Sequence, residues 1–152
     1  LRSLGISPAK IWRDAGLGIV SACLLAPALA VLVLVSGIPA GPSFIPAELG
    51  LLAPPSPAAA WLAVLFLPFL EELLFRGFLY RLLRARWPEI MANLSVSFLF
   101  AAIHGSTGPV AVARFLGSML MCRLFDRTGT LWSSLGAHAG FNALLLLGPA
   151  AL

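Results

Sequence analysis

Residues 58–86 read AAAWLAVLFLPFLEELLFRGFLYRLLRAR. The apolar run 58–70 leads directly into Glu71, Glu72 and Arg76, so three charged side chains stand inside a hydrophobic helix. Trp87-Pro88 ends that helix, because proline cannot continue the hydrogen-bond ladder and restricts the residue before it. A charge at the centre of a bilayer costs about 2.5–3.5 kcal/mol on insertion scales. This stretch therefore favours a functional site within a membrane helix over a purely structural ion pair.

The composition indicates an integral membrane protein. Of the 152 residues, 60% are hydrophobic and 11% are charged, whereas an ordinary soluble domain has about 25% charged residues. A soluble domain of this length could not bury so much apolar surface. The net charge of +4 lies on basic residues that flank apolar runs, which is typical of contact with a membrane surface. Basic patches with interleaved polar residues are missing, so we expect membrane lipid and no nucleic acid as a partner.

Hydrophobicity predicts about five spans, since a spanning helix needs roughly 20 mostly apolar residues. Residues 36–57 between the first two spans are rich in proline and glycine and predict a loop, with a short amphipathic piece at Phe44–Leu52. We therefore expect an all-α, polytopic transmembrane bundle that forms one membrane-embedded domain over residues 1–152, with a motif-bearing core at 58–148. The predicted spans are Ala15–Val35, Ala58–Arg86, Glu89–His104, Val110–Phe125 and Leu131–Leu147.

The basic residues alternate between the ends of these spans. Three groups flank the start of the first span, the end of the second and the turn between the fourth and fifth, whereas the other three ends have no lysine or arginine. The positive-inside rule then places the N-terminus in the cytoplasm and the C-terminus outside, and we expect the cell membrane of a bacterium as the location. The basic groups are Arg2, Lys10 and Arg13; Arg81, Arg84 and Arg86; Arg123 and Arg127.

Polar residues at helical spacing mark the candidate site. Glu72 and Arg76 stand at i and i+4, with the acid on the favourable N-terminal side, so they are predicted to pair. Glu71 points about 100° away round the helix and needs another partner. The only two histidines follow the same spacing: His104 lies four residues after Phe100, and His138 lies four residues before Asn142. Each pair therefore shares one face of its helix.

Depth along the helices allows these groups to meet. At 1.5 Å per residue, Glu71 lies about 22 Å from Arg86, His104 about 25 Å from Trp87 and His138 about 16 Å from Arg127. Modest helix tilts would bring Glu71, His104 and His138 together inside the membrane. Gly136 and Gly140 flank His138 as a small-xxx-small pair, which is typical of a close helix contact.

Three motifs resemble those of the CAAX-protease and bacteriocin-processing membrane family, also called the Abi family. Glu71-Glu72-Leu73-Leu74-Phe75-Arg76 is similar to its first motif, two glutamates followed by arginine after three residues. Phe100-Ala101-Ala102-Ile103-His104 is similar to the second, and His138-Ala139-Gly140-Phe141-Asn142 to the third. Their order and their placement on separate hydrophobic helices make the resemblance specific. It covers roughly Trp61–Leu147.

The resemblance implies an intramembrane endopeptidase without a covalent intermediate and without a metal or other cofactor. In that family's mechanism, Glu71 and His104 would activate a water, and His138 and Asn142 would stabilise the oxyanion. Glu72 and Arg76 would orient Glu71, and Phe100 is expected to pack beside the site. The implied substrate is a membrane-associated or C-terminally anchored protein or peptide.

Two alternatives stay open. Two histidines and a glutamate would suit zinc with one open position, which would make the chain a membrane metallopeptidase, although the HExxH pattern is absent. A member of this family could also serve as a non-catalytic immunity or scaffold protein. The filled motif positions favour an active enzyme over that reading.

Overall fold

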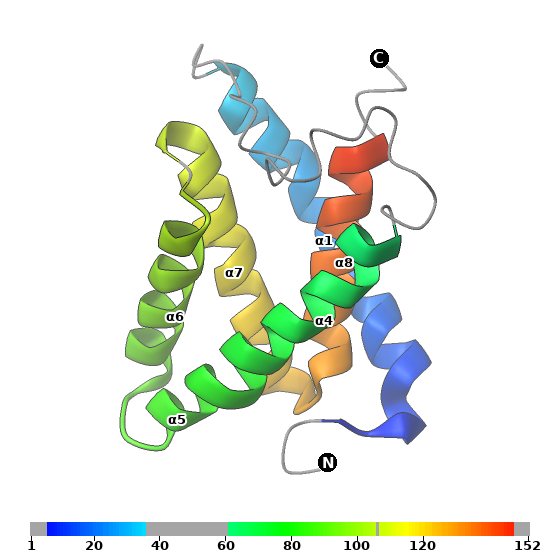
Figure 1. Cartoon of the computed structure of the whole chain (residues 1–152), viewed down its shortest axis with the longest axis vertical. Coiled ribbons are helices and arrows are strands. Elements are labelled where there is room, and N and C mark those ends of the chain that lie inside the picture. Colours follow the sequence, from blue (N-terminus) through cyan, green and yellow to red (C-terminus); the bar gives the residue numbers. More distant parts are fainter. Residues whose placement is uncertain (1–5, 36–60, 106, 148–152) are drawn as a thin grey trace.

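The computed structural model describes residues 6–35, 61–105 and 107–147, and within these ranges the chain is helical with no strand (Figure 1). The predicted loop at 36–57, including Phe44–Leu52, lies outside the described residues. Five helical segments follow one another, as the hydrophobic pattern predicts. The first is α1 (Ile11–Val35), which follows the short turn η2 (Pro8–Lys10). The second is one continuous helix made of η4 (Leu62–Phe66), α4 (Leu67–Glu72), η5 (Leu73–Tyr80) and α5 (Arg81–Arg84). The last three are α6 (Glu89–Ile103), α7 (Gly108–Thr128) and α8 (Leu131–Leu147).

The ends of α7 lie two to three residues outside the predicted bounds, because both flanking sequences continue the helix. Pro109 falls in the first turn of α7, where its missing N–H has no helical partner to lose. At the other end Gly129 adopts a left-handed φ of 68° and donates its N–H to the Phe125 carbonyl at 2.8 Å. Such a glycine cap ends helices at low cost.

The second helix departs from regular α geometry on both sides of α4. The N–H of Leu67 bonds to the Leu62 carbonyl, five residues back, in the π-helical stretch η4. Pro68 follows directly, and because proline lacks an N–H and crowds the preceding turn, a widened turn accommodates it. A second π-helical stretch, η5, follows the two glutamates. Short π-helical segments are frequently found at functional sites.

Helices α1 and α8 lie side by side, and α6 pairs with α7 (Figure 1). The close approach of α1 and α8 depends on glycine. A Cβ at Gly18 would lie 2.0 Å from the Ser133 carbonyl oxygen, and one at Gly136 would lie 2.2 Å from that of Ala15. The predicted helix contact at Gly136 is therefore present, and it fixes the depth of α8, the helix that carries His138.

Three helix ends gather at the lower end of the bundle in Figure 1: the start of α1, the end of α5 and the end of α7. Most basic residues of the described chain lie at these ends, including Lys10, Arg84 and Arg127, whereas Arg76 and Arg114 lie within helices. The basic groups at alternate ends of the predicted spans thus lie together at one end of the folded bundle. Such an end is typical of the cytoplasmic side of a membrane protein.

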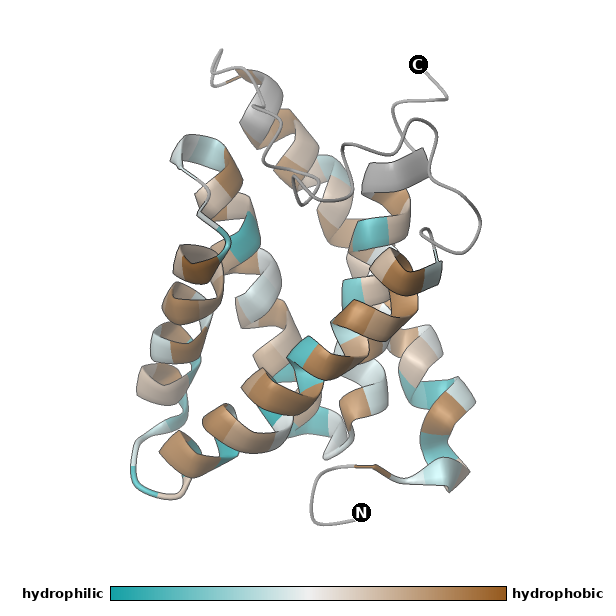
Figure 2. Ribbon diagram, viewed as in Figure 1, coloured by the Kyte–Doolittle hydropathy of each residue, from teal (hydrophilic) through white to brown (hydrophobic). Residues whose placement is uncertain are grey.

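The molecule exposes many large apolar side chains and buries several charged ones. Trp12, Leu24 and Phe98 are 89%, 76% and 70% exposed, while Glu72 and Arg76 are fully buried. In Figure 2 hydrophobic residues run along most of the second helix and of α6. Two helices, Pro8–Leu32 and Gly108–Thr128, are long and apolar enough to cross a membrane, and Glu89–Ile103 is a shorter apolar helix. An exposed apolar surface of this extent marks contact with lipid or a partner.

Candidate active site

Glu72 lies at the centre of the buried polar cluster. Its Oε1 atom accepts hydrogen bonds from Arg76 Nη1 at 2.6 Å and from His138 Nδ1 at 2.9 Å. The i, i+4 pair predicted from the sequence is therefore present, and both of its side chains have no exposed surface. The expectation was that Glu72 would support Glu71, but its contacts run to Arg76 on its own helix and to His138 on α8.

Arg76 joins this cluster to two further helices. Its Nη2 atom donates to the Ser118 hydroxyl at 2.6 Å and to the Ser118 carbonyl at 3.3 Å, both on α7. Its guanidinium carbon stands 5.0 Å from the centre of the Phe100 ring on α6, within the range of a cation–π contact. The buried cation thus has partners on three sides, which offsets the cost of removing it from water.

Glu71 brings the two histidines together. Its Oε2 atom lies 3.6 Å from His138 Nε2 and 3.8 Å from His104 Nε2. That oxygen is buried and accepts no hydrogen bond from the described residues, while the side chain as a whole is 33% exposed. Two imidazoles, from the end of α6 and from α8, therefore converge on one carboxylate oxygen of α4.

His104 is oriented by the end of its own helix. Its Nδ1 atom lies 2.6 Å from the Phe100 carbonyl, and its ring lies 4.5 Å from the Phe100 ring, centre to centre. A carbonyl can only accept, so Nδ1 carries a proton. In a neutral imidazole the other nitrogen, Nε2, then presents a lone pair to Glu71.

His138, like His104, is oriented by a hydrogen bond at Nδ1 and by contact with the Phe100 ring. Its Nδ1 atom donates to the Glu72 carboxylate, and its ring stands edge-on to Phe100 with centres 5.6 Å apart. Its Nε2 atom therefore carries a proton only when the ring is an imidazolium. Phe100, predicted to pack beside the site, contacts both imidazoles and the guanidinium of Arg76.

Asn142 lies one turn after His138 on α8. Its Nδ2 atom donates to the carbonyl of Ala63 in η4 at 2.9 Å. A side-chain amide has two N–H donors, so this contact uses one and orients the other. The same bond ties α8 to the π-helical stretch that precedes the two glutamates.

Sequence reasoning missed several contacts of this cluster. Ser118 on α7 accepts a hydrogen bond from Arg76 of the second helix at its hydroxyl oxygen. Arg114 donates a hydrogen bond to the His104 carbonyl at 3.2 Å. Neither residue belongs to a spaced motif, so no local pattern could have identified them. Within the described ranges, no three His, Cys, Asp or Glu side chains are grouped as metal ligands.

A comparison with family models identifies the family of the chain. The model described as "Type II CAAX prenyl endopeptidase Rce1-like" matches residues 53–144, which is more than half of the chain and includes all three motifs. Comparisons with curated proteins and with solved structures gave no match. The family is one of membrane-embedded proteases, in agreement with the apolar exterior and the buried charges. The chain therefore belongs to the Rce1-like family of type II CAAX prenyl endopeptidases.

Proposed function

We propose that this chain is an intramembrane endopeptidase, folded as one membrane-embedded domain, that uses a water molecule held by Glu71 and His104. The observation that carries the proposal is the convergence of His104 Nε2 and His138 Nε2 on Glu71 Oε2, at 3.8 Å and 3.6 Å. Glu71 Oε2 is buried and accepts no hydrogen bond from the described residues, so a water beside it would supply the missing partner. The Glu71 side chain as a whole is 33% exposed.

Glu71 and His104 suit the activation of water because both present acceptors. With its Nδ1–H donated to the Phe100 carbonyl, His104 offers the Nε2 lone pair to one hydrogen of the water. Glu71 takes the other hydrogen as general base while the water oxygen attacks the peptide carbonyl carbon. The proton on Glu71 then passes to the leaving nitrogen when the C–N bond breaks, so no covalent enzyme intermediate forms.

His138 and Asn142 are proposed to donate hydrogen bonds to the oxyanion that develops on the peptide carbonyl oxygen. His138 must be an imidazolium for this, because its Nδ1–H is already donated to Glu72. The Glu72 and Glu71 carboxylates both lie beside the ring, so these two acids offset the charges of the imidazolium and of Arg76. Asn142 contributes the amide hydrogen that does not bind Ala63. Donors fixed before the reaction cost no reorganisation when the charge develops.

One competing function would use the same residues. If both imidazoles are neutral, His104 and His138 present lone pairs near the Glu71 carboxylate, and these are ligand types of a zinc peptidase, although the described residues hold no group of three placed as metal ligands. The chain would then be a membrane metallopeptidase that acts on the same class of substrate. The two functions give His138 incompatible roles, and removal of metal distinguishes them.

The proposed substrate is a protein or peptide that is membrane-associated or anchored at its C-terminus. The test uses Glu71→Gln, which keeps the shape of the side chain and removes the base. Peptides that co-purify with this variant from native membranes are identified by mass spectrometry and then offered to the parent protein in liposomes. Cleavage of a captured peptide by the parent, and none by Glu71→Gln, is expected.

The matched control is Glu89→Gln. Glu89 is an exposed glutamate at the start of α6 that pairs with Arg123 and has no contact with the cluster. This variant should cleave at the parental rate. Full activity of Glu71→Gln would overturn the proposal, as would a parent that releases no product from any captured peptide, which would favour a non-catalytic immunity or scaffold role.

A further inference from the structure

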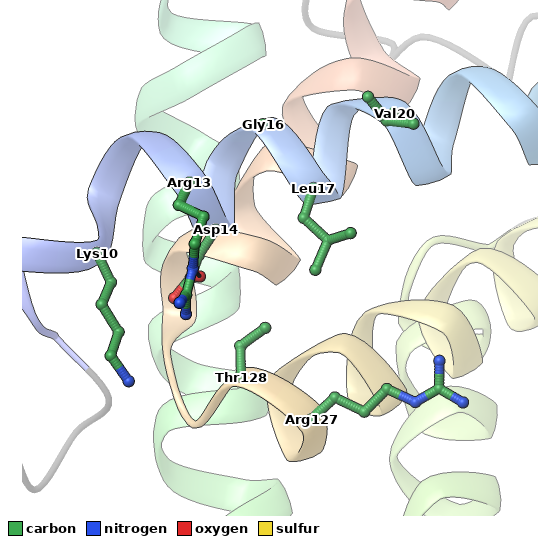
Figure 3. A pocket seen from close by; sticks show the side chains of 8 residues that line it. All are labelled: Lys10, Arg13, Asp14, Gly16, Leu17, Val20, Arg127 and Thr128. Carbon is green, nitrogen blue, oxygen red and sulfur yellow. Dashed lines mark hydrogen bonds and ion pairs between the residues drawn. The ribbon is translucent and has the colours of Figure 1, made fainter.

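A pocket of about 550 Å³ lies between α1 and the end of α7, and it shares no residue with the candidate active site (Figure 3). Its volume falls within the range of small-molecule sites, about 300–1,000 Å³. It lies at the end of the bundle where the basic helix ends gather. Its lining consists of Lys10, Arg13, Asp14, Gly16, Leu17, Val20, Arg127 and Thr128.

The lining combines a surplus of positive charge with an apolar wall. Three cations face one acid, Asp14, and that acid is already satisfied: it is 1% exposed and accepts hydrogen bonds from Arg13 at 2.8 Å and from Thr130 at 2.7 Å. Lys10 and Arg127 remain as exposed cations from two different helices. In Figure 3 Lys10 and Arg127 lie on opposite sides of Thr128, and the guanidinium of Arg127 points away from Lys10.

The apolar part continues along the outer surface of α1. Leu17 and Val20 line the pocket and are 46% and 57% exposed, and Trp12 stands at the same end of the helix. Tryptophan is enriched at the level of lipid headgroups. A ligand that fits must therefore join an anionic group to a hydrocarbon chain that runs towards the bilayer centre.

We propose that this pocket binds an anionic phospholipid, with its phosphate attracted by the exposed side chains of Lys10 and Arg127 and an acyl chain against Leu17 and Val20. Arginine and lysine both bind phosphate through charge-assisted hydrogen bonds. Basic pockets between membrane helices on the cytoplasmic side recognise anionic headgroups by the same physics. The inference goes beyond the proposed peptidase function and does not depend on it.

The first experiment measures binding of single lipid molecules to the full chain in neutral detergent by native mass spectrometry. The probes are dioleoylphosphatidylglycerol and dioleoylphosphatidylcholine, which have the same acyl chains. Each basic side chain near an anionic lipid contributes about 1 kcal/mol, or about fivefold. The pair Lys10→Gln/Arg127→Gln should therefore lose roughly 25-fold in affinity for the anionic lipid. The control pair Arg81→Gln/Arg86→Gln removes the same charge from exposed positions that do not line the pocket, and it should change little.

The second experiment uses the fact that Lys10 is the only lysine in the chain. One equivalent of the anionic lipid should slow amine-directed labelling of Lys10 in the parent and in Arg81→Gln, but not in Arg127→Gln. This readout needs only single substitutions of exposed residues, and unfolding temperatures in lipid-free detergent check that each variant is folded. Equal losses in both pairs, equal binding of the two lipids, or unchanged labelling would overturn the proposal. Displacement of the lipid by inorganic phosphate at equal concentration would also overturn it, because the pocket would then be a site for a soluble anion.

Discussion

The Nδ1 atom of His138 lies 2.9 Å from Oε1 of Glu72, and Arg76, one turn after Glu72 on the same helix, donates to the same oxygen. One carboxylate oxygen therefore fixes both the imidazole of α8 and the guanidinium of η5. This contact also decides the proton on His138: the ring cannot donate from Nε2 while neutral, because its Nδ1–H is already used. The second glutamate of the first motif thus acts on the third motif directly.

Replacing Glu72 with glutamine should damage both folding and catalysis. The change leaves Arg76 buried without a counter-charge, and breaking a buried pair by removing one partner typically costs about 3–5 kcal/mol. It also removes the charge that balances an imidazolium at His138, so kcat should fall more than KM rises. Thermal unfolding in detergent and steady-state kinetics on a cleaved peptide measure the two effects.

The double variant Glu72→Gln/Arg76→Met serves as the comparison, because it removes the unpaired cation together with the acid. It should recover much of the lost stability without recovering kcat. If it recovers kcat as well, Glu72 acts only through folding and has no role in positioning His138.

Asn142→Ala should leave a partly active enzyme. Loss of one oxyanion donor typically lowers kcat by about 10²–10³. The variant also leaves the Ala63 carbonyl without its donor, so a modest loss of stability, about 1 kcal/mol, should accompany it. Asn142→Gln can still reach Ala63 but shifts the second N–H. Stability restored by glutamine without restored kcat would separate the two functions of the amide, whereas parental kcat in Asn142→Ala would remove it from the oxyanion site.

The sequence predicted the elements of the site better than their contacts. Helical spacing placed Glu72 beside Arg76, and hydrophobic length placed five helices, because both are local properties of the chain. The partner of Arg76 at Ser118 depends on which faces of α4, η5 and α7 meet, and no spacing along one helix records that. Residues that act between helices remain hidden until the helices are packed.

Asp14 illustrates a second limit of sequence reasoning. The predicted first span begins at Ala15 and therefore leaves Asp14 outside it. The helix begins at Ile11, and Asp14 is buried inside it because Thr130, 116 residues later, donates a hydrogen bond to it at 2.7 Å. The hydrogen bond from Thr130 offsets the cost of burying the Asp14 carboxylate, so the helix extends past the predicted boundary.

The gathering of basic ends predicts that the lower end of the bundle in Figure 1 faces the cytoplasm. A reporter that is active only in the cytoplasm should give a signal when inserted between α5 and α6, at residues 85–88, and no signal when fused after Leu152. A reporter active only outside the cytoplasm should give the reverse pattern. A strong cytoplasmic signal after Leu152 would contradict the five-span topology, since an even number of crossings would then separate the two ends.

Removal of metal should leave the peptidase active. In the water mechanism, Nε2 of His138 carries a proton and donates it to the oxyanion, whereas a zinc ligand must present a lone pair at that atom. Because Nδ1 of His138 is occupied by Glu72, no other nitrogen of this ring can take either role. The purified protein is therefore expected to keep its activity after dialysis against a strong chelator and to contain no stoichiometric zinc by elemental analysis. Glu72→Gln provides a second measurement, because removal of a carboxylate that hydrogen-bonds a ligating histidine typically lowers metal affinity 10–100-fold. The water mechanism would be wrong if chelation abolished activity, zinc alone restored it, and the parent needed a lower zinc concentration than Glu72→Gln. Glu71, His104 and His138 would then be metal ligands.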